Sequence, residues 1–333
     1  MKKLKKITTI LCLLMLFGCS TNSDTNGNTT TVVVPIAPSN LTGTAVSTTE
    51  VNLSWTDNST NETGFKIERK TASGTFAVVG TTSTDITVFN DTGLIPNATY
   101  IYRVFSNNTA GNSLTYSNEL IITIAPTDID GNSYTTVNIC NQTWMQKNLN
   151  TTKYSDGTTI PQVTDPTAWS NLTTGAWCYY DNDPANEAVY GKLYNWYAVA
   201  GIYNAASAAN PGLRKKLAPS GWHLPTDAEW TNLTDCLGGE AVAGGKMKEI
   251  GLSHFISPNA FATNSSGFTG LPGGCRNIGG GFNNITGVGY WWSSSENGTL
   301  GVWYRSIGTG DGNVFRGNDG NKYFGVSVRC VKD

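Results

Sequence analysis

The chain has 333 residues, of which 22 are Lys or Arg and 24 are Asp or Glu, so its formal net charge at pH 7 is −2. Charged residues make up 14% of the sequence, against about 25% in an average soluble domain, and there is no basic run. We therefore expect no nucleic-acid partner. The length allows two domains that are each large enough to hold a core.

The first 19 residues have the pattern of a bacterial lipoprotein signal. Four Lys between positions 2 and 6 precede an apolar stretch, Ile7 to Phe17, which is shorter than the about 20 residues needed to span a bilayer. Leu16-Phe17-Gly18-Cys19 resembles a lipobox, which makes Cys19 the predicted lipidation site and the new N-terminus. An uncleaved membrane anchor is the alternative. Ser20 after the Cys favours a surface-exposed, lipid-anchored position on the outer membrane.

The next segment, residues 20–35, is rich in Thr, Asn and Ser at its start and is predicted to be a flexible tether. Residues 36–125 then alternate apolar and polar positions, with turn residues every 8 to 12 positions, which predicts an all-β immunoglobulin-like sandwich. Val51, Leu53 and Trp55 form one inward face of this sandwich. Leu94–Tyr100 resembles a tyrosine corner, and the segment as a whole resembles a fibronectin type III domain. Such a module most often acts as a spacer, and a specific ligand role is the alternative.

A strong helix start signal lies in the remaining part, residues 126–333. Thr226 is a good N-cap, and Glu229 follows three residues later, as a capping box requires. Trp230, Leu233 and Leu237 fall on one helical face, and Gly238-Gly239 ends the helix. Tyr190–Val199 also has helical spacing.

Three stretches carry a family resemblance: Pro219–Trp230, Gly287–Glu296 and Phe324–Val331. In this order they resemble the Fibrobacter succinogenes major paralogous domain over roughly residues 127–333. That family is related to C-type-lectin-like folds and to the formylglycine-generating, sulfatase-modifying fold. The resemblance implies a cell-surface α+β lectin-like domain with two helices and many short antiparallel strands. It implies no particular chemistry.

Other segments of this part are predicted from local patterns. Asp128–Tyr134 is typical of a turn, with the start of a calcium loop as the alternative. Asp181, Asp183 and Glu187 form the densest carboxylate cluster, which is either a solvated turn or a calcium site. Ile202–Arg214 is expected to be a mobile insertion.

Short strands and turns are expected after Gly239, where large apolar and polar residues alternate. The predicted strands are Leu271–Arg276, Tyr290–Ser293, Val302–Ile307, Asn313–Arg316 and Phe324–Val331. The predicted hairpin turns are Gly308–Gly312 and Gly317–Asn321.

Five Cys remain outside the signal segment: Cys140, Cys178, Cys236, Cys275 and Cys330. The sequence does not decide how they pair. In the resembling family, a Cys usually precedes the Pro-Ser-Gly-Trp-His motif and reaches the Cys of the final strand. Here Ala218 occupies that position, so the resemblance implies that Cys330 is a buried free thiol, with pairing to a Cys such as Cys236 as the alternative.

Catalysis is weakly indicated. The sulfatase-modifying relatives use a paired-thiol copper site, for which Cys275 and Cys330 would be the candidates, but the surrounding residues do not match. His223 is expected to be a buried, hydrogen-bonded structural residue, and His254 has no evident partner. We therefore predict that the protein is not an enzyme.

Binding of a polysaccharide or another surface ligand fits the sequence better, because exposed aromatic faces stack on sugars while carboxylates and amides bond to the hydroxyls. A structural scaffold that contacts other envelope proteins is the alternative. No cofactor is predicted, with calcium left open, and the membrane is contacted through the N-terminal lipid. The candidate ligand-binding residues are Trp291, Trp292, Glu296, Asn297, Trp303, Tyr304, Arg305 and Asn318.

Overall fold

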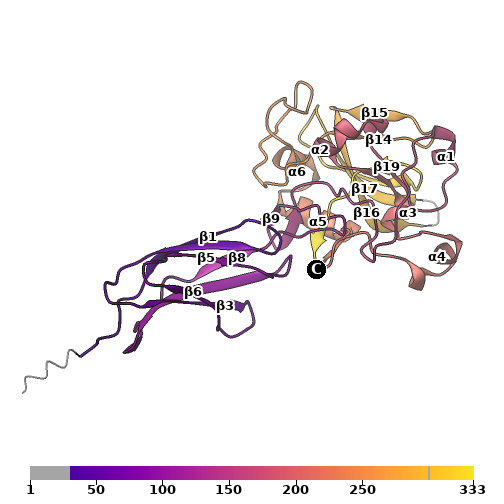
Figure 1. Ribbon diagram of the computed structural model, residues 1–333. Helices are drawn as coiled ribbons and strands as arrows, with labels where there is room; N and C mark the ends of the chain where they lie inside the picture. Colours follow the sequence, from indigo (N-terminus) through magenta and orange to yellow (C-terminus); the bar gives the residue numbers. More distant parts are fainter. Residues whose placement is uncertain (1–30, 299–300) are drawn as a thin grey trace, which may run out of the picture.

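The computed structural model describes residues 31–298 and 301–333. The predicted signal segment, Cys19 and the beginning of the tether lie outside these residues. The described chain forms two bodies, a narrow β-sandwich that comes first and a larger mixed body that contains the C-terminus (Figure 1). Every helix within the described residues is too short or too polar to cross a membrane.

The first body is a sandwich of two antiparallel sheets, as the alternation predicts. One sheet has the order β1-β2-β5, and the other has the order β4-β3-β6-β7 with β8 paired to β6. Their bounds are β1 (Ser39–Ala45), β2 (Val51–Thr56), β3 (Gly64–Thr71), β4 (Ala77–Ser83), β5 (Val88–Asp91), β6 (Thr99–Asn108), β7 (Gly111–Asn112) and β8 (Leu120–Thr123).

The sandwich core follows the predicted inward face. Val51, Leu53 and Trp55 are buried between the sheets, while the residues between them on β2 face solvent. The hydroxyl of Tyr100 accepts a hydrogen bond from the backbone N–H of Ile95 at 3.0 Å. This bond is the predicted tyrosine corner, which fixes the loop before β6.

The last residues of the predicted tether are attached to the sandwich. The carbonyl of Val33 accepts hydrogen bonds from the side-chain amides of Asn61 at 3.0 Å and Asn108 at 2.8 Å. Pro35 is buried. The domain therefore begins before residue 36, because these contacts hold the entering chain against the β2–β3 loop and the end of β6.

The second body contains three sheets, ordered β13-β20-β10-β9, β11-β12-β19-β14-β15 and β16-β17-β18. The strands are β9 (Thr136–Ile139), β10 (Gln142–Met145), β11 (Trp177–Cys178), β12 (Leu193–Asn195), β13 (Trp222–His223), β14 (Gly273–Arg276), β15 (Phe282–Ile285), β16 (Val288–Asn297), β17 (Gly301–Gly308), β18 (Phe315–Asn321), β19 (Gly325–Val326) and β20 (Val331–Lys332). The helices are α1 (Pro166–Ser170), α2 (Glu187–Tyr190), α3 (Trp196–Val199), α4 (Ala205–Ala209), α5 (Asp227–Cys236) and α6 (Glu240–Met247), with 3₁₀ turns η1 (Tyr180–Asn182), η2 (Pro184–Asn186) and η3 (Pro211–Leu213).

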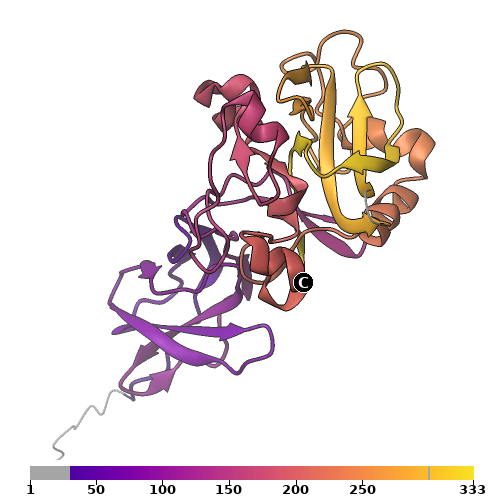
Figure 2. The same cartoon turned by 90° about the vertical axis from the view of Figure 1, so that its right-hand side faces the viewer.

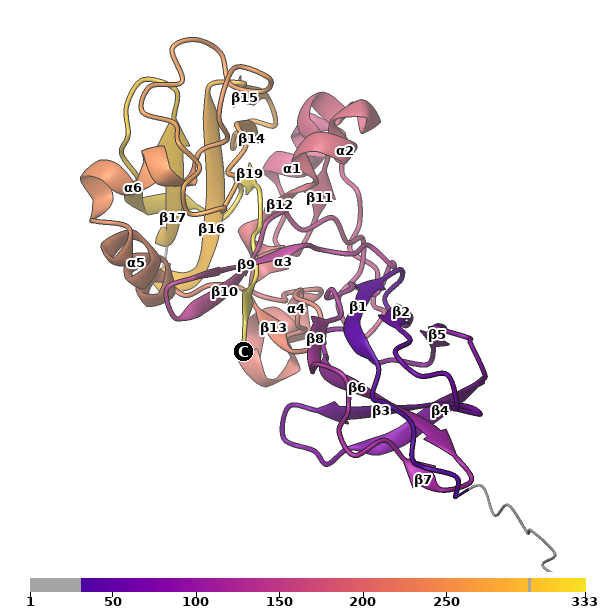
Figure 3. The same cartoon turned by 90° about the vertical axis from the view of Figure 1, so that its left-hand side faces the viewer.

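The long hairpin β16–β17 separates two layers of this body. Helices α5 and α6 lie on one side of it, and strands β14, β15 and β19 lie on the other (Figure 3). The chain from about residue 150 to residue 215 lies beside the three-stranded sheet (Figure 2) and supplies β11 and β12 to the five-stranded sheet. The last strand, β20, pairs with both β10 and β13, so the two ends of the body are joined.

Helix α5 begins where the capping box predicts. Thr226 Oγ1 accepts a hydrogen bond from the Glu229 N–H at 3.2 Å, and Glu229 Oε2 accepts one from the Thr226 N–H at 2.8 Å. Trp230 and Leu233 are fully buried against the β16 side of the core. The helix ends at Cys236, just before two glycines with φ of 104° and 92° at Gly238 and Gly239.

The single helix predicted for Tyr190–Val199 is wrong. Strand β12 separates α2 from α3, because Leu193–Asn195 pairs with both β11 and β19. The side chains of Leu193 and Trp196 are buried, as they would also be in a single helix. Apolar spacing alone therefore does not distinguish one helix from a strand followed by a helix. Ile202–Arg214, expected to be a mobile insertion, contains α4 with its own capping box at Asn204 and Ser207.

Two further expectations after Gly239 need correction. Helix α6 is absent from the prediction because Gly244 and Gly245 lower helical propensity. Both glycines are required by packing. A Cβ added to Gly244 would lie 2.1 Å from the Asn313 carbonyl oxygen, and one added to Gly245 would lie 2.5 Å from the Phe261 carbonyl oxygen. Gly317–Asn321 lies within β18 rather than in a hairpin turn, whereas the turn predicted at Gly308–Gly312 does connect β17 to β18.

Candidate ligand-binding site

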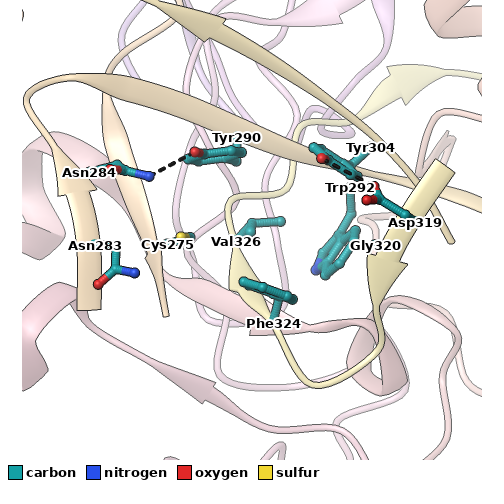
Figure 4. A pocket seen from close by; sticks show the side chains of 10 residues that line it. All are labelled: Cys275, Asn283, Asn284, Tyr290, Trp292, Tyr304, Asp319, Gly320, Phe324 and Val326. Carbon is teal, nitrogen blue, oxygen red and sulfur yellow. Dashed lines mark hydrogen bonds between the residues drawn. The ribbon is translucent and has the colours of Figure 1, made fainter. Parts of the chain in front are cut away.

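A pocket of about 250 Å³ lies between the β16–β17–β18 sheet and the β14, β15 and β19 edge of the five-stranded sheet (Figure 4). We consider it the candidate site because aromatic faces, a carboxylate and side-chain amides converge on one concave space. Its lining residues are Cys275, Asn283, Asn284, Tyr290, Trp292, Tyr304, Asp319, Gly320, Phe324 and Val326.

Alternation along β16 brings Tyr290 and Trp292 to the pocket and directs Trp291 to the opposite layer. The rings of Tyr290 and Tyr304 have centroids 6.4 Å apart and planes inclined at 45°. Both tyrosines are partly exposed. Trp292 is only 2% exposed, and its Nε1–H donates to the Tyr194 carbonyl at 2.9 Å. Trp292 is therefore a fixed floor beneath two accessible tyrosines.

The polar groups lie around these rings. Asn284 Nδ2 donates to the Tyr290 hydroxyl at 2.9 Å. The Tyr304 hydroxyl is directed at Asp319 Oδ1, 3.5 Å away, and Asp319 itself is exposed. The pocket thus offers apolar ring faces together with free donor and acceptor capacity on Asn283 and Asp319.

Glycines on β18 make room for the aromatic side chains. A Cβ added to Gly317 would lie 2.2 Å from the Tyr304 ring, and one added to Gly320 would lie 3.0 Å from the Trp292 ring. No larger residue fits at Gly317 without displacing Tyr304. The glycine-rich composition of this strand therefore determines the shape of the pocket.

The two tyrosines and the cysteine of the pocket are neutral at pH 7. Burial, followed by the nearby charge of Asp319, raises the pKa of Tyr304 to about 12. Burial is also the main cause of the raised pKa of Tyr290, and it raises the pKa of the Cys275 thiol to about 11. The tyrosine hydroxyls can both donate and accept, whereas Cys275 is not a thiolate nucleophile.

The two candidate thiols do not share this pocket. Cys330 is fully buried and is not among the lining residues. Burial also raises its pKa well above the ordinary range. The paired-thiol site that a sulfatase-modifying oxidase would need is thus not formed by Cys275 and Cys330.

Two of the predicted ligand-binding residues belong to the core instead. Trp291 is 0% exposed and packs against Trp230 and Phe268. Arg305 is 1% exposed, and its Nη1 pairs with Asp227 Oδ1 at 2.8 Å. Both predictions are corrected for the same reason, since neighbouring positions on β16 and β17 face opposite layers.

The remaining candidates lie outside the pocket, apart from Trp292 and Tyr304. Trp303 is partly exposed, with the Arg316 guanidinium 4.0 Å from its ring centroid. Glu296 and Asn297 are exposed at the end of β16. Asn297 Nδ2 donates to the carbonyl of Asn318 at 2.9 Å, so Asn297 and Asn318 link the end of β16 to β18. The pocket residues on β15 were missed because this short strand carries no recognisable sequence signal. Strand β19 lies within the predicted strand Phe324–Val331, but the sequence did not show that its residues would line a pocket.

Of the two interpretations of Asp181, Asp183 and Glu187, the geometry favours the solvated turn over the calcium site. Asp183 Oδ1 accepts from the Ala185 N–H at 2.9 Å, and Glu187 Oε1 pairs with Lys192 Nζ at 2.6 Å. Their carboxylates do not converge, and the group of three potential ligands found within the described residues lies elsewhere, at Asp57, Glu62 and Asp85. This second cluster was missed because its members come from two separate loops.

The segment Asp128–Tyr134 forms the expected turn. The Gly131 N–H donates to the Asp128 carbonyl at 3.0 Å, and Asp128 Oδ1 accepts from the Asn132 N–H at 3.0 Å. Because the carboxylate is used within the turn and by the hydroxyl of Tyr134, the turn interpretation is confirmed.

The two histidines are held by carboxylates. His223 is partly exposed rather than buried, and its ring nitrogens lie 2.7 Å from Glu229 Oε1 and 2.7 Å from Asp333 Oδ1. Burial lowers its pKa, but the bonds to Glu229 and Asp333 outweigh burial, so the pKa is raised overall. His254 has a partner that the sequence did not reveal, because Glu249 Oε2 lies 2.8 Å from its Nδ1.

One disulfide is present among the described cysteines, between Cys140 and Cys236, whose Cα atoms are 6.6 Å apart. Cys178, Cys275 and Cys330 are buried and free. The prediction that Cys330 is a buried free thiol is therefore confirmed, and Cys236 pairs with the β9–β10 turn instead.

Comparison with known proteins identifies both bodies. The sequence profile of the Fibrobacter succinogenes major domain family matches residues 137–332, which is more than half of the chain. The chain belongs to this family. The fibronectin type III profile matches residues 36–123. Both family predictions are confirmed, and the Fibrobacter succinogenes major domain supplies every residue of the pocket.

Similar solved structures cover only a small part of the chain. Domains A168–A170 of titin are 25% identical, covering 27% of this chain and 32% of that one, with a TM-score of 0.25. A Fn3-like protein from Clostridium thermocellum is 24% identical, covering 27% and 92%, with a TM-score of 0.24. This chain spans about a third of the titin structure, and TM-scores this low carry no argument. No curated protein matches the chain.

Proposed function

We propose that the protein is a non-catalytic surface module whose Fibrobacter succinogenes major domain binds the terminal ring of a polysaccharide in the pocket between β14–β15–β19 and β16–β17–β18. The two families in this chain are those of extracellular or surface modules. The observation that carries the proposal is the pair of partly exposed rings, Tyr290 and Tyr304, beside the exposed carboxylate of Asp319.

The chemistry of a sugar ring matches these groups. A pyranose has an apolar face that packs on an aromatic ring and a rim of hydroxyls that need both donors and acceptors. Neutral tyrosine hydroxyls and the Asn283 amide supply both, and Asp319 accepts. The volume of about 250 Å³ is below the roughly 300–1,000 Å³ of pockets for drug-sized ligands, which favours one ring at the end of a chain.

The residues that line the pocket favour binding of a sugar over its hydrolysis. Most glycoside hydrolases need two carboxylic groups across the scissile bond, whereas Asp319 is the single carboxylate among the described lining residues. The Cys275 thiol is protonated at pH 7 because burial raises its pKa to about 11. A bound sugar would thus be held without an adjacent acid–base pair or nucleophile.

The proposal places the module on the outer membrane, with Cys19 lipidated and the sandwich as a spacer. Its support is the lipobox in the sequence. A lectin-like fold for the second domain is part of the same proposal, supported by the pairing of β20 with β10, which brings the domain ends together and away from the pocket. Cys19→Ser should abolish metabolic lipid labelling, and continued labelling would refute the anchor.

A glycan array tests the binding proposal directly. The protein should bind a subset of glycans with a common terminal sugar, with and without calcium. Tyr304→Ala and Tyr290→Ala should each weaken that binding by about tenfold or more, equivalent to about 1.4 kcal/mol. Phe261→Ala is the matched control, because Phe261 is an aromatic residue 76% exposed outside the pocket. Unchanged binding in both tyrosine variants would reject the site.

A further inference from the structure

The fibronectin type III domain contains a cluster of three carboxylates that the proposed function does not use. Asp57 and Glu62 lie on the loop between β2 and β3, and Asp85 lies on the loop between β4 and β5. One potential ligand atom from each residue lies within 4.8 Å of the others. Two separate loops therefore bring three like charges to one point.

Glu62 gives an independent indication of a ligand. Glu62 is only 6% exposed. Its Oε2 is buried without a hydrogen-bond partner among the described residues. A buried carboxylate oxygen without a partner is costly, and this one belongs to a carboxylate that supplies one oxygen to the cluster. The other two carboxylates do not relieve that cost, because they carry the same charge.

Elsewhere in the same domain, one buried and one half-buried carboxylate each have a basic partner. Asp91 pairs with Arg69 at 2.6 Å, and Glu68 pairs with Arg103 at 2.7 Å. Within residues 31–298 and 301–333, none of the ion pairs includes a member of the cluster. The charge of this site is thus uncompensated by the protein side chains that the structure describes.

We propose that Asp57, Glu62 and Asp85 form a binding site for a divalent, oxygen-seeking cation, with Ca²⁺ favoured. Oxygen ligands bind Ca²⁺ at about 2.3–2.6 Å, so two ligands of one ion are at most about 5 Å apart, and the observed cluster meets this limit. Asp57 Oδ1 already accepts the Ser59 N–H at 2.9 Å, which leaves its other oxygen for the ion. All three ligands are oxygens, which favours Ca²⁺ or Mg²⁺ over Zn²⁺.

The position of the site suggests its consequence. Gly64, which follows one loop, pairs with Ser83, which precedes the other, and with Asn107, which pairs with β7. The site therefore lies at the end of the sandwich that carries β7, which is away from the second body (Figure 3). Asn61, between two of the ligands, donates to the Val33 carbonyl of the entering chain. A bound cation would join the two loops and stiffen the point where the chain enters the sandwich.

Isothermal titration of the chelator-treated protein with CaCl₂, and separately with MgCl₂, tests this proposal. We expect one equivalent of Ca²⁺ per chain and a higher melting temperature of the sandwich on binding. Glu62→Gln and Asp85→Asn should each weaken Ca²⁺ binding by tenfold or more. Asp181→Asn is the matched control, because it removes an exposed carboxylate of the other domain and should leave binding unchanged.

Two outcomes would overturn the proposal: no binding of either ion to the unmodified protein, or one-equivalent binding that persists in the variants. Circular dichroism establishes that each variant folds. If Glu62→Gln does not fold, Asp57→Asn and Asp85→Asn decide, because both replace residues that are less buried than Glu62. The result is independent of glycan binding, which depends on the other domain.

Discussion

Two groups of aromatic residues on opposite sides of β16 have different environments and, we propose, different roles. On the helix side, Trp144, Trp230, Phe268 and Trp291 form a closed cluster, with ring centroids 4.8 to 6.5 Å apart. On the other side, Tyr290 and Tyr304 remain partly exposed above Trp292. Three consecutive residues of one strand thus serve two layers, and aromatic content alone does not identify a binding surface.

The closed cluster is reinforced by a buried cation. The Arg329 guanidinium lies 4.3 Å from the Phe268 ring centroid, and it donates to Asn148 Oδ1 and to the Met145 and Phe268 carbonyls. Asn148 Oδ1 also accepts from Trp291 Nε1–H at 2.8 Å. This side of β16 is therefore closed and reinforced by a buried hydrogen-bond network around Arg329 and Asn148, whereas the pocket side keeps free polar capacity.

The largest expected effect separates the two groups by stability. Trp230→Ala should lower the free energy of unfolding of the second domain by about 3–5 kcal/mol, because it leaves a large cavity. Tyr304→Ala should cost about 1 kcal/mol, because part of its ring is already exposed. Urea denaturation followed by near-UV circular dichroism measures both. Equal losses would mean that Tyr304 is a core residue.

Removing the carboxylate of Asp227 should weaken the connection between the helix layer and the pocket sheet. This carboxylate at the start of α5 pairs with Arg305 of β17 at 2.8 Å and with Arg316 of β18 at 2.6 Å. Asp227→Ala leaves Arg305 buried and unpaired, so we expect a loss of about 3 kcal/mol.

The Asp227 carboxylate should also make the stability of the second domain depend on pH. Burial raises the pKa of Asp227, but bonds from Arg316 and Arg305 outweigh burial and lower it overall. The stabilisation is thus complete above the unfolded pKa of about 3.9 and is lost as the pH falls through the folded pKa. Denaturation midpoints between pH 7 and pH 2 should converge for the wild type and Asp227→Ala. A difference that stays constant would contradict the ion-pair account.

Removal of the disulfide should affect the core side more than the pocket side. Cys140–Cys236 joins the β9–β10 turn to the end of α5 across 96 residues. The double replacement with Ser should cost about 2–3 kcal/mol, since the unfolded chain gains freedom. Glycan binding of the folded double variant should be unchanged. If the double variant is fully folded but no longer binds glycan, the core side and the pocket side of β16 are coupled.

The smallest effect is expected at His223, on the surface of the helix side. Its pKa is raised in the folded state by Glu229 and Asp333, against the opposing effect of burial. Its contribution is therefore fully present below the unfolded pKa of about 6.5 and is lost as the pH rises through the folded pKa. His223→Gln should lower the melting temperature at pH 5.5 and have almost no effect at pH 9. The reverse order would be inconsistent with a charged pair.

The sequence predicted the helix side better than the pocket side. The capping box at Thr226 and Glu229, together with the spacing of Trp230 and Leu233, is local information, and α5 forms as expected. The pocket depends on β15 and β19, of four and two residues, whose positions are decided by pairing with distant strands. The prediction placed both Trp291 and Trp292 in the ligand site, although alternation makes them face opposite sides of β16, and the sequence did not show which side would be covered by helices.

Long-range convergence was likewise invisible in the sequence. Asp181, Asp183 and Glu187 are close along the chain but face different partners. Asp57 and Asp85 are separated by a strand pair, yet they meet at Glu62. Proximity along the sequence therefore did not show which carboxylates converge in space, because the loops of Asp57, Glu62 and Asp85 are brought together only by the folded sandwich.

The most direct test of the proposed site is a crystal structure of the protein soaked with the oligosaccharide that binds most tightly on the array. We expect density for a sugar ring packed against the exposed faces of Tyr290 and Tyr304, with a hydroxyl within hydrogen-bonding distance of Asp319. Density at the exposed face of Trp303 or on the fibronectin type III domain, with an empty pocket, would contradict it.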